Sequence, residues 1–158
     1  MLNKYIILLF SILFIGIGCS KDSSNDFNET AQFEKDKQLI REYLNRYHIK
    51  ADSTADGLYY IIDDTIASSN FKKPTTDSKV TVNYVGYFLD NKVFDTGNNI
   101  QFPLSSVIKG WQIGIPVMKE GESGRFFIPS RFGYGTQGNS SVPANSVLIF
   151  DVELLKVE

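Results

Sequence analysis

The chain has 158 residues, of which 42% are hydrophobic and 22% charged, and its formal net charge is −2. This length suits one domain with a short appendage. No stripe of Lys and Arg appears that would neutralise a run of phosphates, so we expect no nucleic-acid partner.

The N-terminus begins with a nearly continuous apolar run from Tyr5 to Ile17. The run is as long as the core of a signal peptide and too short to span a bilayer comfortably. Small and polar residues follow it, together with the only cysteine of the chain, Cys19. This pattern predicts a signal peptide over residues 1–18. An ordinary secretory peptide and an uncleaved N-terminal anchor are the alternatives.

The boundary around Cys19 also resembles the signals of bacterial lipoproteins, although Gly16 stands where those signals prefer Leu. The resemblance implies that Cys19 is acylated and becomes the new N-terminus. The protein would then contact the membrane through several acyl chains, which hold more firmly than one. We therefore expect a lipid-anchored protein of the cell envelope, facing either the periplasm or the cell surface.

Residues 19–32 are rich in Ser, Asn, Asp and Glu, which predicts a flexible tether. The segment 33–56 then opens with an amphipathic helix of about four turns. Its apolar stripe would pack on its own domain or space that domain from the membrane. Dimerisation through the stripe is the alternative, but its periodicity is too irregular to specify a coiled coil, so we expect a monomer. The stripe comprises Phe33, Leu39, Ile40, Tyr43, Leu44 and Tyr47, and the polar residues outside it include Asp36, Arg41 and Glu42.

The pattern changes from helical to strand-like after Gly57, which marks a second unit over residues 57–158. Val80, Val82 and Tyr84 alternate with more polar residues, as in a strand with one buried face. Residues 107–115 have apolar side chains at helical spacing, and Pro116 ends that helix. Residues 147–157 form a long final strand. The sequence thus predicts an α+β domain, with four or more antiparallel strands around one short helix.

Five short motifs of this unit resemble the FKBP-type prolyl isomerases, in that family's order. The resemblance implies a twisted antiparallel β-sheet wrapped around one short α-helix, with a shallow apolar cup between them as the active site. The chain departs from the family in its short loop after Asp95, which lacks an arginine. The motifs are Val82–Gly86, Val93–Asp95, Val107–Trp111, Phe132–Gly135 and Leu148–Leu154.

The same resemblance implies roles for individual residues. Trp111 would be the floor of the cup, and Tyr134 a polar group at its edge. Val107 and Ile108 would form a rim, while Ile100 stands where an aromatic wall residue is common. The resemblance also implies that macrolide inhibitors bind in the cup, and these departures would change both the turnover and the macrolide affinity. The catalytic set is Tyr84, Phe94, Asp95, Trp111, Tyr134 and Phe150, and the substrate-binding set is Ile100, Val107, Ile108 and Val142.

These residue types suit the isomerisation of Xaa-Pro bonds in proline-containing polypeptides. Rotation must break amide resonance, a barrier of roughly 18–20 kcal/mol, and it requires no nucleophile. An aromatic cup favours the twisted amide, which has less charge separation than the planar one. The Ile108 amide and the Tyr134 hydroxyl would donate hydrogen bonds to the peptide. We expect no cofactor and no metal, and the single histidine, His48, fits a surface residue.

Three alternatives remain for these residues. Aromatic side chains in a small sheet domain also serve core packing alone. The cup could hold proline-containing segments as a chaperone without catalysing their isomerisation. Asp95-Thr96-Gly97 resembles the active-site loop of aspartic proteases, which need two such aspartates and so would require a dimer here.

Overall fold

The computed structural model describes residues 23–63 and 72–158 of the chain. The predicted signal peptide over 1–18 and the predicted lipidation site at Cys19 lie outside these residues. Within the two described ranges, none of the helices has the length and apolar character needed to cross a membrane.

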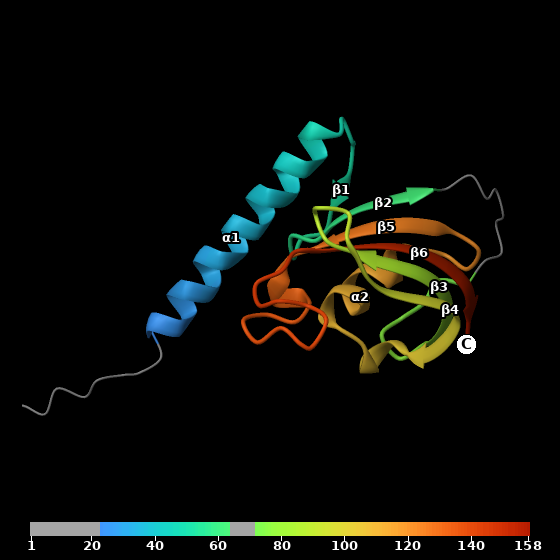
Figure 1. The fold of residues 1–158 in the computed structure, drawn as a ribbon. Coiled ribbons are helices and arrows are strands. Elements are labelled where there is room, and N and C mark those ends of the chain that lie inside the picture. The colour runs from blue at the N-terminus through green and yellow to red at the C-terminus, as the bar shows by residue number, and fades with distance from the viewer. Residues whose placement is uncertain (1–22, 64–71) are drawn as a thin grey trace, which may run out of the picture.

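A six-stranded, fully antiparallel sheet dominates the fold (Figure 1). Its strand order is β1-β2-β5-β6-β3-β4, so the last strand in sequence, β6, lies inside the sheet and β4 forms one edge. The prediction of an α+β fold with an antiparallel sheet is confirmed. The strands are β1 (Asp52–Ser53), β2 (Tyr59–Asp63), β3 (Lys79–Tyr87), β4 (Val93–Pro103), β5 (Ser123–Ile128) and β6 (Leu148–Val157).

The inner face of the sheet curves around the short helix α2 (Lys109–Gly114), which Figure 1 shows in its concavity. Val80 and Val82 of β3 are fully buried, as the alternation in the sequence predicts. They belong to an inner core to which Trp111 of α2 and Phe150 of β6 also contribute. The helix ends where Pro116 enters a short 3₁₀ turn, Ile115–Val117.

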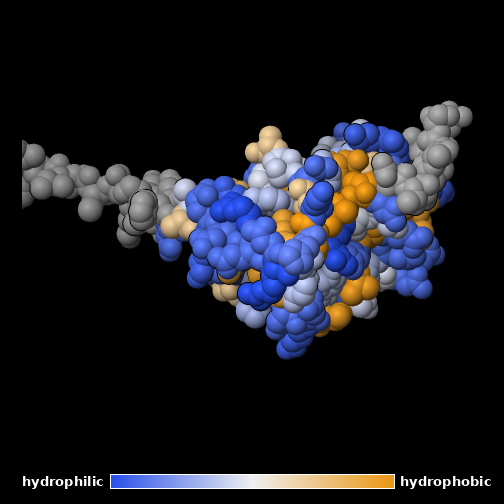
Figure 2. All heavy atoms as spheres, turned by 90° about the horizontal axis from the view of Figure 1, so that it is seen from above, coloured by the Kyte–Doolittle hydropathy of each residue, from blue (hydrophilic) through white to orange (hydrophobic). Residues whose placement is uncertain are grey.

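The outer face of the sheet packs against the long helix α1 (Ser23–Arg46). Ile40, Tyr43 and Leu44 are buried, and Tyr43 contacts the Phe127 ring of β5 at a centroid distance of 5.8 Å. Most of the apolar stripe therefore packs on its own domain, although Tyr47 remains half exposed. Seen from above in Figure 2, hydrophilic side chains cover most of the surface near the start of α1, while apolar surface gathers towards the middle and right of the view.

The bounds of α1 differ from the predicted ones at both ends. The helix already begins at Ser23, inside the predicted tether of residues 19–32. Gln32 at the end of that range donates to Asp36 one turn later, and Asp36 is fully buried rather than on the polar side. At the other end, the helix stops at Arg46, which fits the predicted four turns after residue 33 but leaves the last ten residues of the predicted segment 33–56 outside the helix. His48 adopts a left-handed conformation there (φ 54°), and the Ile49 amide donates back to the Leu44 carbonyl, which ends the helix.

Candidate functional site

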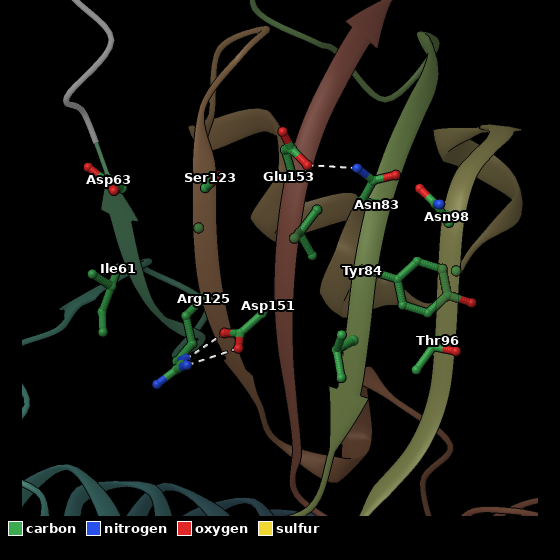
Figure 3. A pocket seen from close by; sticks show the side chains of 14 residues that line it. Ile61, Asp63, Asn83, Tyr84, Thr96, Asn98, Ser123, Arg125, Asp151 and Glu153 are labelled. Carbon is green, nitrogen blue, oxygen red and sulfur yellow. Dashed lines mark hydrogen bonds and ion pairs between the residues drawn. The ribbon is translucent and has the colours of Figure 1, made fainter.

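Two hollows lie on opposite faces of the sheet. The larger, of about 750 Å³, opens on the outer face beside α1 and is shown in Figure 3. Several of its polar side chains already bond one another: Arg125 donates to Asp151 at 2.9 Å, and Asn83 donates to Glu153 at 2.7 Å. Because these side chains already pair with one another, they are less available to bond a ligand in the larger hollow.

The smaller hollow, of about 360 Å³, lies on the inner face between the sheet and α2. We call it the cup. It combines aromatic rings with a few polar groups, the composition typical of a small ligand site. The structure brings together eight of the ten residues that the sequence predicts for the site. The lining comprises Tyr84, Asp95, Ile100, Phe102, Ser106, Val107, Ile108, Trp111, Tyr134 and Phe150.

Trp111 is the centre of the aromatic cluster under the cup. Tyr84 and Phe150 meet its ring edge-on at centroid distances of 5.0 and 5.1 Å, and Phe102 packs on it at 5.3 Å. The Trp111 Nε1–H is buried and has no hydrogen-bond partner among the described residues. An unpaired buried donor costs free energy, so core packing alone would not favour tryptophan at this position.

Polar groups converge on one side of the cup. The Tyr84 hydroxyl donates to Asp95 Oδ2 at 2.9 Å, and the Thr96 amide donates to Asp95 Oδ1 at 2.8 Å. Burial, followed by the hydrogen bond to Asp95, raises the pKa of Tyr84 to about 12. Burial and then the charge of Asp95 raise the pKa of Tyr134. A tyrosine hydroxyl is protonated at neutral pH even without these shifts, and the Tyr84 proton is already donated to Asp95.

The rim of the cup is held in place by a residue of α2. Gln112 Nε2 donates to the Val107 carbonyl at 2.9 Å and to the Ser105 carbonyl at 3.3 Å. Ile108 is the N-cap of α2, and its carbonyl accepts from the Trp111 amide. Its own amide lies before the first helical turn and takes no part in the hydrogen bonds within the helix. These contacts fix the rim relative to the floor beneath it.

Gly97 allows β4 to approach the Tyr84 ring. A Cβ at this position would lie 2.2 Å from Tyr84 Cε1, closer than real side chains come. The register between β3 and β4 shifts at the same place, between Val82 and Tyr84. The glycine therefore sets how far the Tyr84 ring can lie over the strand, and with it the position of the hydroxyl that bonds Asp95.

Two predicted residues lie away from the cup. Phe94 is not in the lining; its ring lies behind Phe150, at a centroid distance of 5.5 Å, and supports that wall. Val142, predicted to contact substrate, is 2% exposed and belongs to the inner core. Its amide donates to Asn139 Oδ1, in a turn that directs the valine inwards.

The structure also adds two residues that the sequence did not single out. Phe102 lies two positions after Ile100 on β4, so strand alternation places both on one face, and this signal could have identified it. Ser106 ends a short 3₁₀ turn, Leu104–Ser106, just before the rim residues, and no sequence pattern distinguishes it from other serines. Among the described residues, no three His, Cys, Asp or Glu side chains gather closely enough to hold a metal.

Comparisons with known proteins agree on one family. The family model described as FKBP-type peptidyl-prolyl cis-trans isomerase matches residues 71–155. The FKBP-type isomerase FkpA of Aeromonas hydrophila is 37% identical over 83% of this chain and 52% of its own length. A probable FkpA of Neisseria meningitidis serogroup B is 39% identical over 80% of this chain and 47% of its own. The chain thus spans about half the length of these relatives.

Solved structures give the same result for the fold. The crystal structure of FkpA from Escherichia coli matches with a TM-score of 0.68 and 30% identity, covering 86% of this chain and 65% of that one. A peptidyl-prolyl cis-trans isomerase from Pseudomonas syringae pv. tomato matches with the same TM-score and 28% identity, covering 82% of this chain and 95% of that one.

Proposed function

Because the chain belongs to the family of FKBP-type peptidyl-prolyl cis-trans isomerases, we propose that it catalyses the cis–trans isomerisation of Xaa-Pro bonds in the cup. The observation that supports this most directly is the cup itself. An aromatic floor, whose buried indole N–H has no partner among the described residues, lies beside the tyrosines Tyr84 and Tyr134.

The proposed catalysis depends on moving the prolyl amide out of water and on holding the peptide in a fixed orientation. Proline would leave water and enter contact with Trp111 and Phe150, where the planar and more polar amide is less favoured than the twisted one. Each ~1.4 kcal/mol of preference for the twisted amide raises the rate tenfold. The step transfers no proton and forms no covalent bond to the protein.

Two donors would orient the peptide. Tyr134 and Ile108 both line the cup, and the hydroxyl of the first and the amide of the second would donate to carbonyls that flank the prolyl bond. The hydrogen bond between Tyr84 and Asp95 keeps the Asp95 carboxylate occupied, so Asp95 would shape the cup rather than exchange a proton.

The direct test is a rate measurement on a tetrapeptide containing an Xaa-Pro bond. We expect the protein to accelerate its cis–trans relaxation in proportion to protein concentration, and Trp111→Ala to abolish the acceleration. Binding of the peptide without acceleration would favour the non-catalytic chaperone instead. If the protein neither binds the peptide nor accelerates its relaxation, the proposal is refuted.

The protease alternative gives a different result with Asp95. A protease of this class needs two carboxylates that share a proton, and Asp95 is the one acidic residue in the lining of the cup. We expect no peptide cleavage at acidic pH and expect Asp95→Asn to keep most of the isomerase rate, since an amide oxygen still accepts from Tyr84. Acid-dependent cleavage that disappears in Asp95→Asn would favour the protease.

We further propose that the protein is anchored in the cell envelope through acylated Cys19 and acts on exported polypeptides. The support is the sequence around Cys19 and the slow isomerisation of Xaa-Pro bonds during folding. Cys19→Ala should release the protein from the membrane fraction or leave an unprocessed precursor. A processed Cys19→Ala protein that remains in the membrane would contradict the anchor, and protease treatment of intact cells would identify the face.

Two further expectations concern ligands and assembly. We propose that a macrolide inhibitor competes for the cup, with weakened affinity because Ile100 is a smaller and 43% exposed wall. We also propose a monomer, supported by the burial of Ile40 and Leu44 against the chain's own sheet. Competition in the isomerase assay and equilibrium sedimentation test these two points.

A further inference from the structure

Helix α1 is linked to the segment before Tyr134 by one buried carboxylate, that of Asp36. Asp36, in the middle of the helix, is fully buried, and Asp36 Oδ2 accepts from the Ser130 amide at 2.8 Å and from the Ser130 hydroxyl at 2.6 Å. Gln32 donates to the other oxygen, Oδ1, at 2.7 Å. A buried polar group is costly unless hydrogen bonds compensate it, and these three donors provide that compensation.

Ser130 transmits this contact to the segment that contains Tyr134. Its carbonyl accepts from the Gly133 amide at 2.9 Å and from the Gly135 amide at 2.8 Å. These two amides lie immediately before and after Tyr134. An unbroken series of hydrogen bonds therefore connects α1 to the backbone on both sides of this tyrosine.

A second contact clamps the same segment on its outer side. The Phe33 ring of α1 meets the Phe132 ring edge-on at a centroid distance of 5.6 Å. The Arg131 guanidinium lies over both rings, at 4.7 Å from Phe33 and 5.4 Å from Phe132. Figure 1 shows the corresponding stretch of α1 beside the loop that follows β5.

We propose that Asp36 is a positioning residue of the isomerase, which fixes Tyr134 in the cup by holding Ser130. The inference rests on the proposed function. On this proposal α1 belongs to the catalytic unit and is more than a spacer between the domain and the membrane. A shift of the Ser130 backbone would move the Tyr134 hydroxyl away from a bound peptide. Small displacements of an orienting donor are enough to lower a rate.

The test compares Asp36→Ala with Asp36→Asn in the full chain. Alanine removes the acceptor, and we expect kcat/KM to fall several-fold, by no more than the loss caused by deleting the Tyr134 hydroxyl itself. Asparagine keeps an oxygen for Ser130, and Gln32 can turn its amide to pair with the new NH₂ group. We therefore expect Asp36→Asn to restore most of the activity.

Two controls separate positioning from general loss of stability. Ile40→Ala removes a fully buried side chain from the same helix and leaves both hydrogen bonds between Asp36 and Ser130 in place, so it should lower the melting temperature yet leave kcat/KM unchanged below it. In a Tyr134→Phe background, Asp36→Ala should have little further effect on kcat/KM, because the two residues act through one hydroxyl. Equal rate losses in Ile40→Ala and Asp36→Ala, or fully additive losses with Tyr134→Phe, would refute the proposal.

Hydrogen exchange gives a readout that does not depend on activity. Asp36→Ala should speed exchange of the Gly133 and Gly135 amides while the amides that pair β3 with β6 stay protected. If the natural chain proves inactive, the proposed function fails on its own, and this measurement still decides whether Asp36 holds the segment. Unchanged protection at both glycines would overturn the inference.

Discussion

The two faces of the sheet are packed by different means. Part of the outer face is covered by α1, whose apolar stripe comes from one continuous segment of sequence, and the larger hollow lies beside the helix. The inner face packs on α2, which is only six residues long, and leaves the cup open above Trp111. Phe126 and Phe127 illustrate the contrast, since they are neighbours on β5 and both fully buried, yet belong to opposite cores. Stability is thus shared by both faces, whereas the candidate chemistry lies on one.

Trp111→Ala should have the largest effect, because it affects both stability and the site. Removing a large buried ring costs ~3–5 kcal/mol of the free energy of unfolding. We expect this loss in urea denaturation, together with loss of isomerase activity in the fraction that remains folded. Trp111→Phe, which keeps a ring, should recover much of the stability and only part of the activity. Full activity in folded Trp111→Ala would place the reaction elsewhere.

Phe127→Ala tests the outer face with a loss of unfolding free energy similar to that of Trp111→Ala. This ring is fully buried against Tyr43 of α1, and its removal should also cost about 3–5 kcal/mol of unfolding free energy. Because Phe127 points away from the cup, the folded protein should keep its isomerase rate at low temperature. A rate loss as large as that of Trp111→Ala would show that the two faces are not separable.

Tyr134→Phe should change activity with little change in stability. The variant deletes one hydroxyl at the lining of the cup and keeps the ring that packs on the inner core. We expect a decrease in kcat/KM of several-fold, about the value of one orienting hydrogen bond, and a melting temperature close to that of the natural chain. Activity that survives unchanged would remove Tyr134 from the proposed role.

The smallest expected effect is a pH dependence of stability from Tyr84. Its pKa is about 12 in the folded protein and near 10 when unfolded, so the unfolded chain loses this proton first as the pH rises. The contribution of Tyr84 is therefore complete below pH 10 and disappears between about pH 10 and 12. Urea denaturation across this range should show a smaller decline in Tyr84→Phe than in the natural chain. An identical decline in both would contradict the assignment.

Local patterns explain which features the sequence could predict. The burial of Val80 and Val82 depends only on the pleat of one strand, and the structure confirms it for these two residues, although Thr81 between them is buried as well. The position of Asp36 depends on Ser130, which is 94 residues away, so its place on the helix predicted exposure while the structure buries it. Val142 shows the same limit, because a turn closed by Asn139 directs its side chain into the core.

The strand order has a consequence for how the domain forms. β6 is the last strand along the chain, yet it lies between β5 and β3 and pairs with both. Until it is added, β1, β2 and β5 can form one antiparallel sheet and β3 and β4 another, with an unpaired edge on each. During synthesis, the nascent chain would therefore expose two unpaired strand edges until β6 emerges. A protein proposed to assist the folding of others would thus itself complete its fold late, through pairings between distant parts of the chain.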